Sequence, residues 1–553
     1  MLAMAKMTGS RFLAETFKGY GVTHVFFVPA IAKTGLWEMK KLGIQPVLTH
    51  GEKAAAYMAD GYARASHKPG ICMAQSVGAA NLAAGLQDAY LGLAPVIAIT
   101  GTRSSFDKYR HAYQEVEHAP LFQAVTKFDA TVSTVEELPA LMHQAFRQAT
   151  SGAPAPVHLD FMGTNGFVVM NGEADLEVMV DERFSHYPAL RPEPEPERVK
   201  EAAGMLLKAK RPVIVAGGGV TSSGAQKEVV ELAEMLSVPV ATSLNAKGAI
   251  ADEHPLSVGV VGSYSRWCAN RVVAEADLVL FVGSHTGSQV TNEWRIPRPG
   301  TSVIQIDINP ADLGRTYPAR VAILGDAKVT LRQLIDNMGT RKEATEWSKR
   351  VQQTVDLWRK EVEPLAGSNE APTRPERLCK ELADFLPSDA ILVSDTGHAG
   401  IWTGTMVDLN KPGQGYIRAA GSLGWGLPAA LGVKCAQPER PVILFVGDGG
   451  LWYHLAELET ARRYGINIVV VVNNNQSLNQ VQGGYADKPG SGELWQFSDV
   501  DLVNLARAFG CFGAKVTHPG EIKKALSEAL ASNTTAVVDV ITDKNVMAPP
   551  PWA

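Results

Sequence analysis

The sequence predicts an α/β protein of three doubly wound domains, each built on a parallel sheet. At 553 residues the chain is too long for one compact core. Short apolar runs alternate with helix-like segments along its whole length, which is typical of parallel α/β domains. A stretch rich in proline and glutamate, residues 187–197, interrupts this alternation and predicts an extended linker.

The first block contains apolar runs of strand length, separated by segments with helical periodicity. Its strands are expected at His24–Val28, Pro46–Leu48, Ile71–Ala74, Val96–Thr100 and Val157–Phe161. Helices are expected at Glu52–Arg64 and Asn81–Leu91.

The second block opens with Arg211–Gly219, which predicts a buried strand ending in glycines. Its further strands are expected at Val238–Thr242, Leu278–Val282 and Ser302–Ile308, and the charged segment Arg341–Glu363 predicts a connecting helix. The strands of the third block are expected at Ala390–Ser394, Val442–Val446, Ile466–Val472 and Ala536–Val540. The predicted division is therefore 1–185, linker 186–197, 198–340, linker helix 341–372, and 373–553.

Composition narrows the classes of function. A net charge of −5 provides no basic surface for nucleic acid, and no apolar run approaches the length of a bilayer span. The composition, 46% hydrophobic and 20% charged, is ordinary for a soluble globular protein. The five cysteines are scattered without a Cys-x-x-Cys pair, which argues against a disulfide framework and fits the cytoplasm.

The strongest local signal lies at two neighbouring strand ends of the third block. The strand at 441–446 runs into Gly447-Asp448-Gly449-Gly450, and the strand at 466–472 ends in three asparagines, Asn473 to Asn475. Each pattern alone is typical of a turn. One strand–helix–strand unit separates them, so both reach the carboxyl edge of one parallel sheet. Glycines that admit a phosphate, beside carboxylate and amide oxygens, indicate a Mg²⁺–phosphate site.

This pair of patterns resembles the cofactor motif of the thiamine-diphosphate-dependent enzyme superfamily. The resemblance implies that Asp448 and Asn475 are Mg²⁺ ligands and that Ser477 supplies a main-chain oxygen. The triple asparagine leaves Asn474 as an alternative to Asn475. The resemblance also implies contacts with the cofactor from Gly447, Gly449, Gly450, Asn475 and Leu478.

Other segments extend the resemblance over nearly the whole chain. The segment from Ala420 to Ala430 is similar to the one that supports the bent cofactor, with Ser422 beside it and Leu423 between its two rings. Asp395-Thr396-Gly397-His398 is similar to a strand end that touches the diphosphate, which implies roles for Gly397 and His398. The histidine of acetohydroxyacid synthases falls on Ala399 instead.

The first block resembles the pyrimidine-binding domain of the same family. Glu52 begins a segment similar to the catalytic-glutamate helix, although an acid at a helix start is ordinarily a dipole effect. Gly78 resembles the pyrimidine-side loop, and Gln114 resembles a glutamine beside the substrate. The third block would be the diphosphate-binding domain and the second a central domain that holds FAD in some relatives. The resemblance further implies a homodimer at minimum and a homotetramer in full.

The substrate is where the sequence departs from acetohydroxyacid synthases. Ala30 and Ile31 stand where those enzymes carry glycines, and Asn479 follows a motif that lacks their tryptophan; we expect all three in the substrate pocket. The prediction is a carboligase or lyase acting on 2-oxo acids or related carbonyl compounds, acetolactate synthase-like.

Several alternatives stay open. A benzoylformate decarboxylase-like enzyme and a cyclic 1,2-diketone hydrolase-like enzyme use the same cofactor. A nicotinamide dehydrogenase is disfavoured because the dinucleotide fingerprint is incomplete. A non-catalytic relative serving as a binding subunit is disfavoured because Glu52, Asp448 and Asn475 are all present.

Overall fold

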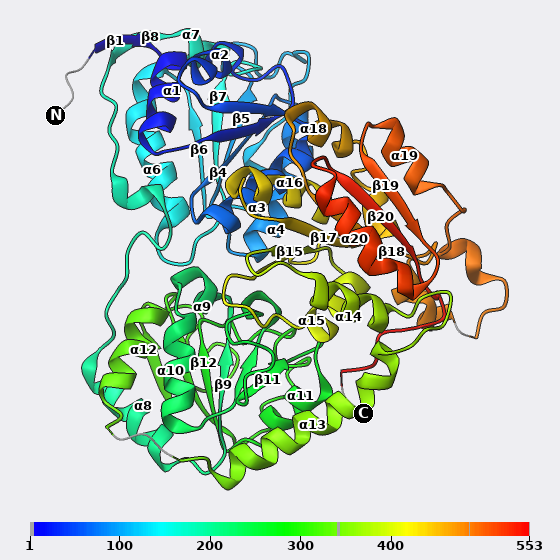
Figure 1. The fold of residues 1–553 in the computed structure, drawn as a ribbon. Coiled ribbons are helices and arrows are strands. Elements are labelled where there is room, and N and C mark those ends of the chain that lie inside the picture. Colours follow the sequence, from blue (N-terminus) through cyan, green and yellow to red (C-terminus); the bar gives the residue numbers. More distant parts are fainter. Residues whose placement is uncertain (1–4, 340–342, 486, 552–553) are drawn as a thin grey trace.

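The computed structural model describes residues 5–339, 343–485 and 487–551, and it contains three six-stranded parallel sheets covered by helices (Figure 1). The predicted fold class is confirmed. A short antiparallel ribbon of β1 (Ala5–Thr8) and β8 (Glu173–Leu176) lies beside the first sheet.

The N-terminal sheet consists of β2 (His24–Phe27), β3 (Gln45–Leu48), β4 (Gly70–Ala74), β5 (Val96–Thr102), β6 (Phe128–Val132) and β7 (Val157–Met162). Its strand order is β3-β2-β4-β5-β7-β6. Its helices are α1 (Gly9–Gly19), α2 (Lys33–Lys41), α3 (Glu52–Ser66), α4 (Gly78–Leu91), α5 (Ala119–Phe122), α6 (Leu138–Thr150) and α7 (Phe167–Asn171).

The central sheet consists of β9 (Pro212–Ala216), β10 (Val240–Thr242), β11 (Ser257–Val260), β12 (Leu278–Val282), β13 (Ser302–Asp307) and β14 (Val321–Leu324). Its order is β11-β10-β9-β12-β13-β14. Its helices are α8 (Pro196–Lys208), α9 (Gly218–Ser223), α10 (Gln226–Leu236), α11 (Trp267–Glu275) and α12 (Ala327–Asp336), followed by the long α13 (Glu346–Ala366). Arg341, where the sequence places the start of α13, lies outside the described residues.

The C-terminal sheet consists of β15 (Ile391–Ser394), β16 (Gly415–Arg418), β17 (Val442–Gly447), β18 (Val469–Asn474), β19 (Phe512–Val516) and β20 (Ala536–Ile541). Its order is β16-β15-β17-β18-β20-β19. Its helices are α14 (Pro375–Phe385), α15 (His398–Met406), α16 (Gly426–Ala436), α17 (Asp448–Trp452), α18 (Glu457–Tyr464), α19 (Leu502–Ala508) and α20 (Ile522–Ala531).

The N-terminal and C-terminal domains meet where α3 packs on α16 (Figure 1). Glycines allow the two helix backbones to touch. A Cβ atom at Gly61 would lie 2.2 Å from the carbonyl oxygen of Ala429, and one at Gly432 would lie 1.9 Å from that of Met58. Since real Cβ atoms do not approach backbone oxygens so closely, both positions require glycine for this packing.

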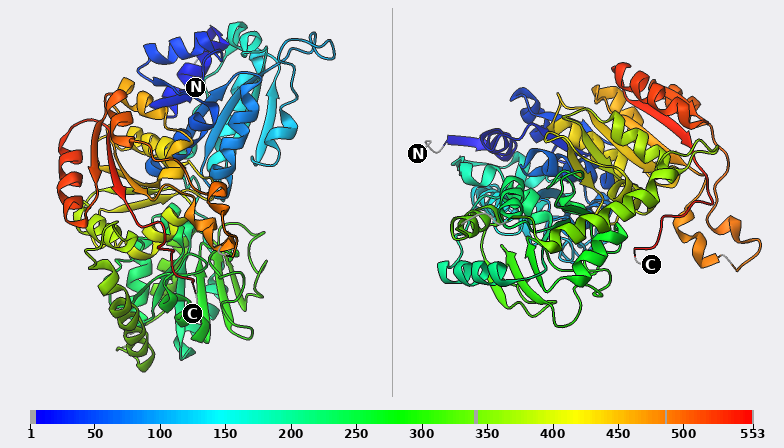
Figure 2. Two further views of the ribbon diagram at one scale, coloured as in Figure 1. Left: turned by 90° about the vertical axis from the view of Figure 1, so that its right-hand side faces the viewer. Right: turned by 60° about the horizontal axis from the view of Figure 1, so that its bottom comes forward.

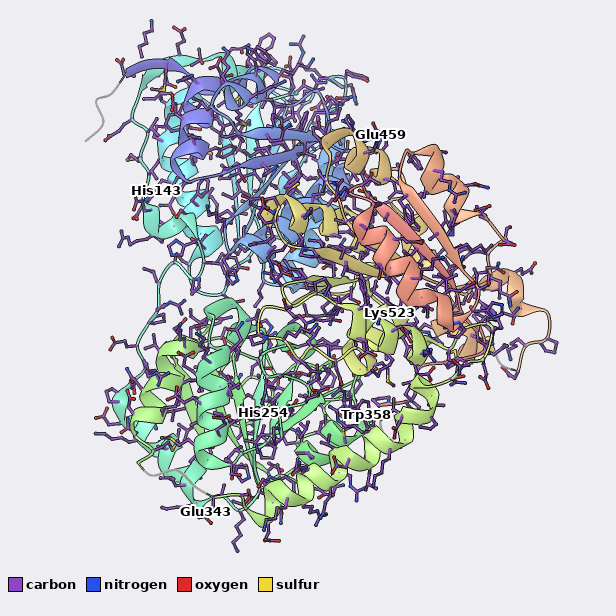
Figure 3. The ribbon with its side chains drawn as sticks, viewed as in Figure 1. His143, His254, Glu343, Trp358, Glu459 and Lys523 are labelled. Carbon is purple, nitrogen blue, oxygen red and sulfur yellow. The ribbon has the colours of Figure 1, made fainter. Side chains whose placement is uncertain are left out.

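Polar groups fix the edges of the same interface. His50 precedes α3, and its Nε2 atom lies 2.7 Å from Oε2 of Glu459 on α18. Figure 3 labels Glu459 beside the N-terminal domain. Arg64 pairs with Asp60 at 2.7 Å and with Asp88 at 3.3 Å, and the indole of Trp425 donates to Asp60 at 2.8 Å.

The central domain is joined to the C-terminal domain by a buried arginine. Arg266 pairs with Asp252 at 3.1 Å and also with Asp408, and its guanidinium lies 4.4 Å from the ring centre of Trp358 on α13 (Figure 3). The end of the chain returns to the central domain, as the views of Figure 2 show, where Asn270 donates to the carbonyl of Pro551 at 2.9 Å. Among the described residues no helix is long and apolar enough to cross a bilayer.

The contact between α3 and α16 predicts a large effect of a single methyl group. We expect Gly432→Ala to lower the free energy of unfolding by about 1–3 kcal/mol, because the helices must separate to admit it. Gly204→Ala on α8 is the matched control, since a Cβ there meets no other atom within 4 Å. Urea denaturation of both variants tests this. Equal midpoints would show that the interface accommodates the methyl group without loss of folding free energy.

Candidate functional site

A cavity of about 300 Å³ lies at the carboxyl edge of the C-terminal sheet. It is formed where β15, β17 and β18 end, with α15 and α17 starting directly from the first two of these strands. Of the residues singled out from the sequence, this cavity brings together Gly397, His398, Leu423, Gly447, Asp448, Gly449, Gly450, Asn475, Ser477, Leu478 and Asn479.

Asp448 is the first residue of α17 and is 3% exposed. Its Oδ1 atom is buried and has no hydrogen-bond partner among the residues that the structure describes. Burial disfavours the charged carboxylate and raises the pKa of Asp448 to about 7. A buried carboxylate oxygen left without a partner fits a cation ligand that faces the cavity. The helix of the predicted strand–helix–strand unit is α18 (Glu457–Tyr464), and a separate short helix, α17, begins at Asp448 itself.

The asparagines at the end of β18 face different neighbours. Asn474 donates its side-chain amide to Asp539 on β20 at 2.8 Å, so this side chain is engaged away from the cavity. Asn475 lines the cavity, where its Oδ1 accepts a hydrogen bond from the hydroxyl of Ser477 at 2.8 Å. This arrangement supports Asn475 over Asn474 as the residue available to a metal.

The glycines of the cavity leave space at its floor. A Cβ at Gly449 would lie 2.5 Å from Cδ2 of Leu478, whereas a Cβ at Gly447 would meet no atom within 4 Å. Gly397 has φ +66°, a backbone conformation that favours glycine, at the start of α15. The open side at Gly447 and the free amides of two helix starts suit a phosphate group.

Two carboxylates position the segment that carries Leu423. Asp395 accepts hydrogen bonds from the amides of Gly424 at 3.1 Å and Gly426 at 2.8 Å, and burial raises its pKa to about 6. Asp88, from the N-terminal domain, accepts a hydrogen bond from the amide of Ser422 at 2.9 Å. Sequence reasoning assigned a role to neither carboxylate, although Asp395 follows a buried strand directly, which is a usable signal.

His398 and a tyrosine from another domain complete the wall. Nδ1 of His398 lies 2.7 Å from Oδ1 of Asn479, and burial lowers the pKa of His398. Tyr264, in the central domain, lines the cavity and accepts a hydrogen bond from the amide of Gln480 at 3.2 Å. Sequence reasoning missed Tyr264 because no local pattern brings residues from separate domains together.

Glu52 lies outside this cavity, at the start of α3. Asn81 donates to its Oε2 at 3.1 Å, and a Cβ at Gly78 would lie 2.5 Å from its Oε1. The structure therefore brings Glu52 and Gly78 together, and Gly78 must lack a side chain for the carboxylate to take this position.

The remaining predicted residues follow the strands of the N-terminal domain. Gln114, with φ +63°, accepts a hydrogen bond at its carbonyl from the hydroxyl of Ser76. Ala30 has φ +77°, so the chain turns there, and Ile31 is completely buried in the N-terminal core. The expectation that Ile31 points toward a substrate is wrong for this structure, because its branched side chain packs in the core instead.

No group of three or more His, Cys, Asp or Glu side chains is arranged to hold a metal within the described ranges.

A second cavity, of about 310 Å³, lies between the three domains. Gly217 to Gly219, His285, Asp307 and Arg418 contribute to its lining. A Cβ at Gly217 would lie 2.1 Å from the carbonyl oxygen of Gly283, so close strand packing by itself explains that glycine.

All three domains match family models of thiamine pyrophosphate enzymes. Residues 7–121, 199–334 and 395–540 match the N-terminal TPP-binding, central and C-terminal TPP-binding domains of these enzymes, respectively.

Relatives match along almost the full length. The chain is 33% identical to a probable acetolactate synthase large subunit of Methanocaldococcus jannaschii, over 97% of this chain and 92% of the relative. It is 30% identical to the large subunit of acetolactate synthase isozyme 3 of Escherichia coli, over 98% of this chain and 96% of the relative. The chain belongs to the thiamine pyrophosphate enzyme family.

Proposed function

We propose that this thiamine-diphosphate-dependent enzyme uses Mg²⁺ to join 2-oxo acids with loss of CO₂, forming one acetolactate from two molecules of pyruvate. The observation that carries the proposal is the unpartnered, buried Oδ1 of Asp448 beside Asn475 in a glycine-lined cavity. The full-length similarity to acetolactate synthase large subunits supports carboligation. It favours neither a benzoylformate decarboxylase-like enzyme nor a cyclic 1,2-diketone hydrolase-like enzyme.

The residues of the cavity fit the cofactor and its metal. Asp448, Asn475 and the carbonyl of Ser477 would hold Mg²⁺, while the amides after Gly447 and Gly397 would face the diphosphate. Bound thiamine diphosphate supplies an electron sink for breaking and forming bonds beside a carbonyl. Asp395 and Asp88 hold the segment of Leu423 by its amides, so this apolar side chain can press on the cofactor and exclude water.

Glu52 is the proposed catalytic acid–base group and would share a proton with a ring nitrogen of the cofactor. Its carboxyl does not line the cavity of Asp448 in one chain. We therefore propose a homodimer in which Glu52 of one subunit faces Asp448 of the other, assembled further into a homotetramer. Apolar side chains on the Glu52 side support this, since Val77 is 46% exposed and Tyr113 is 80% exposed.

Gln114 and Ala30 would lie beside the substrate on the Glu52 side, and Asn479 on the metal side.

We also propose that the cavity between the three domains accepts FAD. Its size fits part of a dinucleotide, and Asp307 stands at the end of β13, where an acid can bind a ribose hydroxyl.

The cysteines of the described residues are all free, which supports a cytoplasmic enzyme.

Product analysis tests the proposed reaction. Purified protein incubated with pyruvate, thiamine diphosphate and Mg²⁺ should give acetolactate by NMR, and none without the cofactor. Acetaldehyde as the sole product would make the enzyme a decarboxylase. The visible absorption spectrum of the same preparation reports whether flavin is bound.

Asp448→Asn tests the metal site. We expect Mg²⁺-supported binding of thiamine diphosphate to weaken about 100-fold or more, because the buried cation loses its carboxylate. Asp384→Asn, at an exposed site on α14, is the control. Calorimetric titration of both proteins measures the affinity, and equal affinities would remove Asp448 from the metal site.

Glu52→Gln tests the proton role. The amide keeps the size of the side chain but cannot take up the shared proton. We expect kcat to fall about 100-fold or more while cofactor affinity changes little. Glu173→Gln on β8 is the control. Steady-state kinetics of both variants measure kcat, and an unchanged kcat of Glu52→Gln would exclude Glu52 from the mechanism.

A further inference from the structure

Loops from the N-terminal sheet are tied together at its carboxyl edge, on the side of Glu52. The amide of Ser76 donates to the carbonyl of Thr164 at 3.3 Å, and the Ser76 hydroxyl donates to the carbonyl of Gln114. The amide of Ala32 donates to the carbonyl of Asn165 at 3.0 Å. A Cβ at Gly101 would lie 2.6 Å from the carbonyl oxygen of Thr164. The ends of β2, β4, β5 and β7 therefore form one surface.

Arg103 leaves this surface directly after β5, two residues beyond Gly101. Its Nε and Nη2 atoms are buried, and neither has a hydrogen-bond partner among the described residues. Oδ1 of Asn165, which follows β7 on the same surface, is also buried and has no partner in the described part of the chain. Burying a cation without a partner is costly, and such a group calls for an anion.

Among the described residues, no acid of the same segment forms a hydrogen bond or an ion pair with Arg103. Asp107 accepts a hydrogen bond from the hydroxyl of Ser104 at 2.8 Å. Glu115 accepts hydrogen bonds from the amides of Tyr109 at 2.6 Å and Ala112 at 2.9 Å. These bonds, with a smaller contribution from the charge of Arg103, hold the pKa of Glu115 below its usual range. Glu117 lies 3.5 Å from Lys108.

These neighbours leave the half-buried Arg103 without a hydrogen-bonded acid from its own segment, although the charge of Glu115 lies near enough to interact with it. A guanidinium presents a planar fork of donors that matches a carboxylate in two parallel hydrogen bonds. Gln114, which we propose lies beside the substrate, is tied to the same surface through its hydrogen bond with Ser76.

We propose that Arg103 binds the carboxylate of the substrate, so that the enzyme selects small carbonyl compounds that carry this group over neutral diketones and aldehydes. This inference rests on the proposed function, because it assigns the substrate to the Glu52 edge. Arg103 acts in recognition and positioning: it takes no proton, and its charge fixes where the neighbouring carbonyl lies.

The test compares an anionic ligand with a neutral one. Oxamate is an unreactive analogue of pyruvate that keeps the carboxylate, and ethyl oxamate is its neutral ester. On the enzyme loaded with thiamine diphosphate and Mg²⁺, Arg103→Gln should weaken oxamate binding about 10–100-fold and leave ethyl oxamate within about threefold. Arg103→Lys should recover part of the loss. Arg110→Gln, an exposed arginine of the same segment, should change neither.

Calorimetric titration measures these affinities without turnover, so the outcome is independent of which product the enzyme forms. Equal loss of both ligands, or loss of neither, would overturn the assignment. A variant with unchanged oxamate affinity but a weakened dimer would show instead that Arg103 pairs with an acid of a second copy. Absence of acetolactate with oxamate binding that still depends on Arg103 would refute the proposed function alone.

With pyruvate as substrate, the effect of Arg103→Gln should appear mainly in KM.

Discussion

The close contact of α3 with α16 is the constraint on which the arrangement of the site depends. Gly61 and Gly432 each meet a backbone carbonyl of the opposite helix, so the two backbones touch without intervening side chains. Glu52 begins α3, and the segment of Leu423 leads directly into α16. Any widening at these glycines therefore moves both groups relative to each other, although neither takes part in the contact.

Charged residues of the N-terminal domain hold the segment that leads into α16. Asp88 accepts hydrogen bonds from the amides of Ala420, Gly421 and Ser422, and Arg64 bridges Asp88 to Asp60. Burial raises the pKa of Asp60 to about 6 even though Arg64 opposes this rise. Because desolvation offsets much of the attraction in a buried ion pair, such a cluster is a weak source of stability. Its directional hydrogen bonds are better suited to holding the 420–422 segment in one position.

Local pattern and parallel topology explain which elements and site residues are predictable from the sequence. Inner strands such as β4, β12 and β17 are apolar because they are buried on both faces, whereas the edge strand β19 mixes polar, glycine and apolar residues. Asp448 and Asn475 are predictable because successive parallel strands end on one edge. Tyr264 and Asp88 are not, since each reaches the site through packing between domains. The placement of Ile31 is predicted wrongly because the turn before it directs its side chain into the core.

The two edges of the site carry opposite charges that the chain itself leaves unsatisfied. On the C-terminal edge a carboxylate oxygen of Asp448 lacks a partner, and on the N-terminal edge the guanidinium of Arg103 lacks one among the described residues. The two groups do not neutralise each other, since each stands at the end of a different sheet. Each costs folding free energy that a ligand of opposite charge recovers when it binds. A cation at one edge and a carboxylate at the other would therefore each relieve a cost of folding. In the proposed dimer, the Asp448 edge of one subunit and the Arg103 edge of the other would orient a substrate between them.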